Sequence, residues 1–143
     1  MQLAFAEAEA AAERGEVPVG AVVVASSGAV LAVAGNQVEA LNDPTAHAEM
    51  LAIRAATGLR GEKVLADCDL YVTLEPCAMC AQAIALARVR RLVFGAYDPK
   101  GGGVEHGARV FDHPTCHHRP ELVGGIEETR AGELLKRFFR ERR

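Results

Sequence analysis

Two Val-rich runs, residues 19–24 and 30–34, stand near the amino end of the chain. A polar stretch ending in Ser-Ser-Gly at 26–28 separates them. Because β-branched side chains favour strands and Ser and Gly favour turns, the pattern predicts a hairpin of two antiparallel strands.

Apolar residues recur at helical spacing close to both ends of the chain. The first such segment covers residues 2–14 and is followed by Gly15, a typical helix stop, and the second covers 127–142. Each is expected to form a surface helix with one apolar face. The inward side chains are predicted to be Leu3, Phe5, Ala6 and Ala10 in the first helix and Leu134, Leu135, Phe138 and Phe139 in the last.

The middle of the chain alternates between strand and helix patterns. A helix over 46–57, with Thr45 as its N-cap, precedes a strand over 69–74, a helix over 78–88 and a strand over 92–95. This order predicts a parallel pair of strands joined by a crossover helix. Residues 99–107, with three consecutive glycines, are expected to form a loop or a flexible lid.

Length and composition narrow the class of protein. At 143 residues, half of them hydrophobic, we expect one domain with a proper core. A net charge of −3 argues against a protein that coats nucleic acid through its overall charge. The amino end lacks the basic start of an export signal, and the longest apolar stretch, 17–25, is too short for a membrane span. We therefore expect a soluble cytoplasmic protein without a membrane partner.

Two short motifs carry the chemistry. His47-Ala48-Glu49 stands at the start of the second helix, and Pro76-Cys77-Ala78-Met79-Cys80 stands at the start of the third. Two cysteines three residues apart on a helical first turn direct both sulfurs to one side, where the helix dipole favours thiolate. Without an export signal, cysteines are more often metal ligands or core residues than disulfide partners. Together the motifs predict a zinc site.

One histidine and two cysteines leave a fourth tetrahedral position for water, as in catalytic zinc sites. His47, Cys77 and Cys80 are therefore the predicted ligands of one zinc ion per chain. Glu49, two residues beyond His47, has the reach and chemistry to move the proton of that water. Two alternatives are a redox pair of cysteines and a structural site whose fourth ligand is Cys116, His117 or His118.

At these residues the sequence resembles the zinc-dependent cytidine and purine deaminases, whose signature is HAE with PCxxC. Four longer strings resemble the bacterial tRNA-specific adenosine deaminases within that superfamily: VPVGAVVV at 17–24, NDPTAHAE at 42–49, LYVTLEPCAMC at 70–80 and FFRERR at 138–143. The resemblance covers nearly the whole chain. It implies one zinc-dependent deaminase domain over residues 1–143, with a three-layer α/β/α cytidine-deaminase-like fold and a mixed five-stranded sheet.

The resemblance also implies a function and a site. The reaction would be hydrolytic deamination of adenosine to inosine at the wobble position of a tRNA anticodon stem-loop, carried out by a homodimer. His47, Cys77 and Cys80 match the zinc ligands, Glu49 matches the proton shuttle, and Asn36 matches the side chain that hydrogen-bonds the purine. The sequence departs from the family pattern after residue 95, where Tyr97 replaces a basic residue.

Five basic residues near the carboxyl end stand against Glu141 alone: Lys136, Arg137, Arg140, Arg142 and Arg143. They are either a solvated helix terminus or, beside a zinc site of this kind, an RNA contact. Two rival functions share the zinc motif. One is a deaminase of a free base or nucleoside, of the guanine or cytosine type, and the other is a non-catalytic binding module stabilised by zinc.

Overall fold

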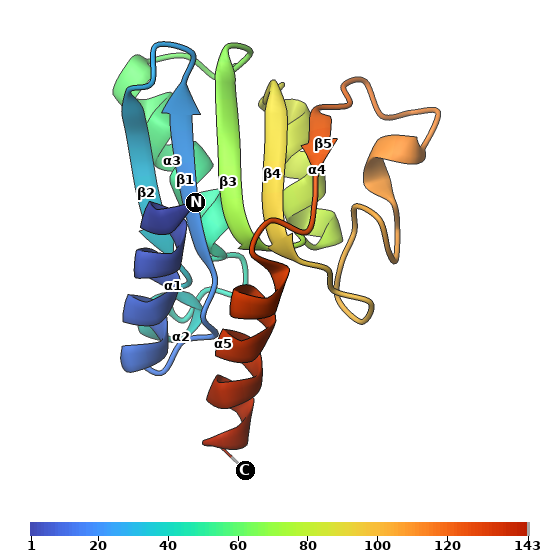
Figure 1. Cartoon of the computed structure of the whole chain (residues 1–143). Helices are drawn as coiled ribbons and strands as arrows, with labels where there is room; N and C mark the ends of the chain where they lie inside the picture. The colour runs from blue at the N-terminus through green and yellow to red at the C-terminus, as the bar shows by residue number, and fades with distance from the viewer. Residues whose placement is uncertain (143) are drawn as a thin grey trace.

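A mixed five-stranded sheet forms the centre of the molecule (Figure 1). The computed structural model describes residues 1–142. The strands, in sheet order, are β2 (Val30–Gly35), β1 (Gly20–Ala25), β3 (Cys68–Leu74), β4 (Arg91–Ala96) and β5 (Glu121–Val123). β1 is antiparallel to both β2 and β3, whereas β3, β4 and β5 are parallel. The predicted hairpin and the predicted parallel pair are both confirmed.

Helices cover both faces of this sheet, which confirms the three-layer α/β/α fold. They are α1 (Gln2–Glu13), α2 (Val38–Leu41), α3 (Ala48–Arg60), α4 (Ala78–Leu86) and α5 (Glu128–Arg140), with a short 3-10 turn at Val110–Asp112. α1 and α5 pack on one face, and α3 and α4 lie against the other (Figure 1). The main core lies under α3 and α4 and includes Ile53, Leu70, Ile84 and Phe94.

The predicted inner face of α1 is partly wrong. The helix buries Ala4, Phe5, Ala8 and Ala11, while Leu3 is 51% exposed. The reason is a close approach between α1 and β1: a Cβ atom on Gly20 would lie 1.9 Å from the carbonyl oxygen of Ala4. At that separation only small side chains fit directly over Gly20, where Ala4 and Ala8 lie, and the larger Leu3 is turned to the outside.

The predicted inner face of α5 is also partly wrong. Leu134 and Phe138 are buried and Leu135 is half-buried, but Phe139 is 49% exposed. Neighbouring residues on a helix point about 100° apart, so Phe138 and Phe139 cannot both face the sheet. The last of the predicted basic residues, Arg143, lies outside the described residues.

Thr45 is not a helix cap, contrary to the prediction. α3 begins at Ala48, two residues after its predicted start, with His47 as its N-cap residue. The amide and hydroxyl groups of Thr45 instead donate to Asp43 Oδ1, at 2.8 and 2.7 Å. This local turn satisfies the hydrogen-bonding groups of Thr45 before the helix starts and leaves His47 at the helix entrance.

Residues 1–142 contain no helix of the length and hydropathy that a bilayer crossing requires.

Candidate metal centre and active-site cavity

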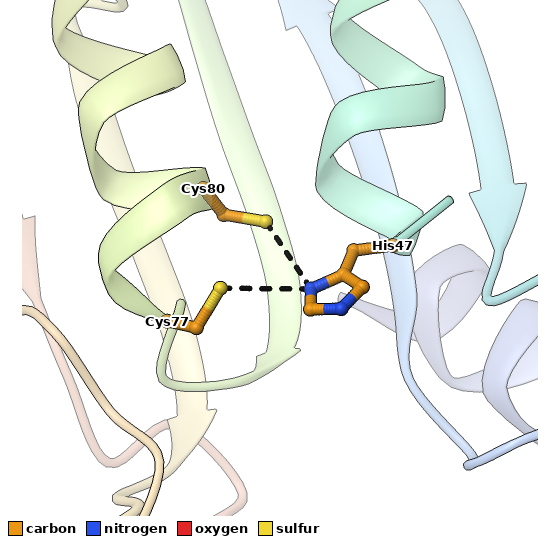
Figure 2. A group of neighbouring side chains, drawn as sticks. All are labelled: His47, Cys77 and Cys80. Atoms are coloured by element: carbon orange, nitrogen blue, oxygen red, sulfur yellow. Dashed lines mark hydrogen bonds between the residues drawn. The ribbon is translucent and has the colours of Figure 1, made fainter. Parts of the chain in front are cut away.

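His47, Cys77 and Cys80 meet where two helices begin (Figure 2). His47 stands at the entrance of α3, Cys77 at the entrance of α4, and Cys80 in the first turn of α4. The Nδ1 atom of His47 lies 3.5 Å from the Sγ atom of each cysteine. The three ligand atoms all lie within 4.8 Å of one another.

The sheet explains why these distant residues converge. β3 runs directly into the turn before α4, while the β1–β2 hairpin and the turn after it lead into α3 on the same face. Both helices therefore start at the same end of the sheet, and Figure 2 shows their three side chains pointing toward one another. This is the end at which open α/β sheets generally place their ligands.

The donor set fits zinc. Bonds of about 2.3 Å to sulfur and about 2.0 Å to nitrogen at tetrahedral angles require S···N separations of roughly 3.5 Å, which match those observed. Within residues 1–142, no other three histidine, cysteine or acidic side chains are grouped in this way. Cys116 instead donates to the carbonyl oxygen of His118, at 3.2 Å. The alternative site completed by Cys116 or its neighbours therefore has no support in the structure.

The cysteines have different electrostatic environments. A hydrogen bond from Cys80, aided by one from His47 and opposed by burial, lowers the pKa of Cys77 to about 4. The same hydrogen bond, together with burial, raises the pKa of Cys80. The hydrogen bond to Cys77 raises the pKa of His47, although burial opposes this. The lowered pKa of Cys77 favours its thiolate form, which is the form that binds a metal cation.

A cavity of about 550 Å³ opens beside these ligands. His47 and Cys77 line it together with Glu49 and Asn36, the two other residues to which the sequence analysis assigned a role. Glu49 lies in the first turn of α3 and is 4% exposed. Because burial disfavours its ionised form, the pKa of Glu49 is raised.

Asn36 follows β2 and is fixed by its own backbone. The backbone amide of Asn36 donates to the carbonyl oxygen of Val19, at 3.1 Å. The backbone carbonyl oxygen of Asn36 accepts a hydrogen bond from Arg14 Nη2, at 3.3 Å. The residue is only 7% exposed. Asn36 is therefore a fixed polar group in the cavity wall.

Several cavity-lining residues were not singled out from the sequence. They are Glu16, Glu75 and Asp98. Phe138, which was predicted to face inward, and Arg142, one of the basic residues near the carboxyl end, were not expected to line this cavity, but they do. Glu75 stands two residues before Cys77 in the same string, so its position beside a ligand was the available signal. Glu16 and Asp98 lie just beyond α1 and β4, Phe138 lies in α5 and Arg142 just beyond it, and no spacing in the sequence connects them with the metal ligands.

Known proteins match this arrangement over most of the chain. The family model of the cytidine and deoxycytidylate deaminase zinc-binding region matches residues 1–96. The tRNA-specific adenosine deaminase of Agrobacterium fabrum is 55% identical over 143 residues, which cover all of this chain and 93% of that protein. The chain belongs to the tRNA-specific adenosine deaminases. The deaminase from Aquifex aeolicus is 47% identical over 144 residues, covering all of this chain and 93% of its own.

A solved structure of this deaminase family has the same fold. It comes from biochemical and structural studies of A-to-I editing by tRNA:A34 deaminases at the wobble position of transfer RNA. The TM-score is 0.92 at 55% identity, covering 94% of this chain and 97% of the other. Membership of a zinc-binding deaminase family, together with the three converging donors, confirms zinc as the cofactor of this deaminase.

Proposed function

We propose that this enzyme removes the amino group of adenosine by hydrolysis at the wobble position of a tRNA anticodon loop, yielding inosine and ammonia. The observation that carries the proposal is the His47, Cys77 and Cys80 group opening onto a cavity that also contains Glu49. The high identity to tRNA-specific adenosine deaminases over the full chain supports the choice of substrate.

In this proposal His47, Cys77 and Cys80 hold the zinc ion, which when bound lowers the pKa of a coordinated water molecule. Glu49 moves the protons. Burial raises the pKa of Glu49, which strengthens its carboxylate as a base toward water, and the protonated carboxyl then delivers that proton to N1 of the adenine ring. The hydroxide left by the first transfer adds to C6 of the adenine ring. Glu49 then passes the proton of the added hydroxyl group to the amino group, the C6–N bond breaks, and inosine and ammonia result.

Asn36 is proposed to hold the purine. A side-chain amide offers both donors and an acceptor, as does the edge of a purine ring. The hydrogen bonds of its backbone to Val19 and Arg14 keep Asn36 in place before substrate arrives, which reduces the ordering cost of binding.

We propose that the anticodon loop binds along the carboxyl-terminal helix. Lys136 and Arg140 of α5, Arg142 just beyond that helix, and Lys100 line a second hollow. Arg142 also lines the first cavity, so the two are adjacent. Positive charge beside the catalytic cavity suits the phosphates of a loop whose target base is splayed outward, and loop bases cost less to unstack than duplex bases.

We also propose that the 143 residues form one deaminase domain, that the protein is cytoplasmic and that it forms a homodimer. The homodimer is supported by two exposed leucines on the helical layer formed by α3 and α4. Leu59 of α3 and Leu86 of α4 are 68% and 69% exposed, so this layer offers an apolar contact to a second copy of the chain. Light scattering of the purified protein tests the dimer, and a monomer at micromolar concentration would contradict it.

The function is tested by incubating the zinc-loaded protein with an anticodon stem-loop that carries adenosine at the wobble position. Inosine is expected in that RNA, and none is expected in the same RNA with guanosine at that position. Free adenosine, guanine and cytosine are assayed in parallel. Activity confined to a free base or nucleoside would contradict the proposed function and would identify the enzyme as a deaminase of free bases or nucleosides.

A further inference from the structure

The carboxylate of Glu75 is completely buried, yet it contacts none of the three metal donors by hydrogen bonding. It accepts five hydrogen bonds from one loop. Oε1 receives the amide of Asp98, at 3.0 Å, and Nδ1 of His106, at 2.8 Å. Oε2 receives the amides of Val104, Glu105 and His106, at 3.1, 2.9 and 3.1 Å. This loop, residues 98–106, is hereafter the glycine loop.

The glycine loop forms one wall of the active-site cavity, to which Asp98 and Gly101 contribute. It also lies directly on the start of α4. The amide of Gly103 donates to the carbonyl oxygen of Pro76, at 2.8 Å, and a Cβ atom on Gly103 would lie 2.5 Å from the nitrogen of Ala78. The glycines therefore allow the loop to approach the helix that carries two metal ligands.

His106 connects the far end of the glycine loop to the sheet. Its ring packs edge-on against Tyr97, with centroids 6.1 Å apart, and Tyr97 packs edge-on against Phe94 of β4, at 5.2 Å. Tyr97 follows β4 directly. In this structure it supports the histidine that donates to Glu75.

We propose that Glu75 and His106 are positioning residues that hold the glycine loop as a fixed wall for the bound nucleotide. The inference rests on the proposed deaminase function for its kinetic consequence. A wall that is ordered in advance lowers the cost of binding. The metal donors and Glu49 are positioned instead by the first turns and N-cap residues of α3 and α4. The hydrogen bonds from the glycine loop to Glu75, including that of His106, are called the clamp. Loss of the clamp therefore raises KM more than it lowers kcat.

Glu75→Gln tests the clamp with little change of shape. All five contacts to Glu75 are donors, so the amide nitrogen of glutamine must face at least two of them in either orientation. His106→Ala removes one donor, and His106→Asn restores a donor near the position of Nδ1. Asp69→Asn is the matched control, since Asp69 is a buried carboxylate bound to Arg90, outside the cavity lining.

Amide hydrogen exchange is measured on the zinc-loaded variants, together with zinc content and kinetics on the stem-loop. Glu75→Gln and His106→Ala are expected to retain zinc, to exchange faster at residues 98–106, and to raise KM by roughly 10-fold, with His106→Asn close to wild type. Unchanged exchange in the glycine loop, or an equal rise of KM in Asp69→Asn, would overturn the proposal. If the wild type deaminates no RNA, the proposed function fails, while exchange still decides the role of the clamp.

Discussion

Nδ1 of His47 lies 3.5 Å from Sγ of Cys77, although 30 residues separate them in the chain. Neither residue makes a side-chain cap for the helix that it starts. Both side chains are instead turned toward each other. The distance between Nδ1 and Sγ matches that between neighbouring ligands of one tetrahedral metal ion. The position of each at a helix entrance thus directs a metal-binding atom toward the other residue and does not cap the helix.

Cys77→Ala and Cys80→Ala are each expected to lose zinc and several kilocalories per mole of folding stability, because thiolate ligation contributes directly to folding. Metal analysis of the purified variants and their melting temperatures measure both effects. Cys116→Ala is the control, because Cys116 lies outside the ligand group, and it should retain about one zinc per chain. Full zinc retention by both ligand variants would contradict the assignment.

Glu49→Gln should keep zinc and fold but deaminate the stem-loop about 10²- to 10⁴-fold more slowly, because the amide preserves shape and cannot accept the proton. Single-turnover kinetics separate this loss from weaker binding. Glu62→Gln, an exposed carboxylate just beyond α3, serves as the control and should be unaffected. Turnover close to wild type in Glu49→Gln would show that another group moves the proton.

Lys100→Gln combined with Arg140→Gln should weaken RNA binding and flatten its salt dependence, with zinc content unchanged. Each lost phosphate contact lowers the slope of log affinity against log salt by about 0.7 for single-stranded RNA. Arg142 is left in place because its guanidinium stacks 3.7 Å from the Phe138 ring centroid and supports the helix.

Binding of the stem-loop to this double variant is measured across a series of ionic strengths. Lys63→Gln, an exposed charge after α3 that lines neither cavity, provides the comparison. A slope identical to that of the wild type would mean that the basic end of α5 is a solvated terminus.

Gly20→Ala should destabilise the fold by about 3 kcal/mol, since the added methyl group meets backbone atoms of α1 that cannot move aside. Gly58→Ala is the matched control. Gly58 lies within α3 and a Cβ atom there meets nothing within 4 Å, so alanine should stabilise the helix by ~0.5–1 kcal/mol. Urea unfolding of both variants measures the difference, and an equal effect of the two would refute the close approach of α1.

Local sequence was sufficient to predict the strands and helices whose residues repeat regularly, and to single out the three side chains that converge as candidate metal ligands. His47, Cys77 and Cys80 could be recognised because zinc requires particular donor atoms, and residue type and spacing along a helix supply them. β5 and α2 carry no such signal. They are 3 and 4 residues long, too short for any periodicity, and form because neighbouring elements offer them partners.

Only the tertiary structure decided which faces turn inward and what surrounds the metal ligands. The burial of Ala4 and Ala8 instead of Leu3 depends on how closely α1 approaches Gly20, a distance set by packing between elements remote in sequence. The clamp of Glu75 likewise depends on backbone amides between 23 and 31 residues away. Backbone donors are the same in every residue type, so no sequence pattern could reveal which of them this carboxylate would meet.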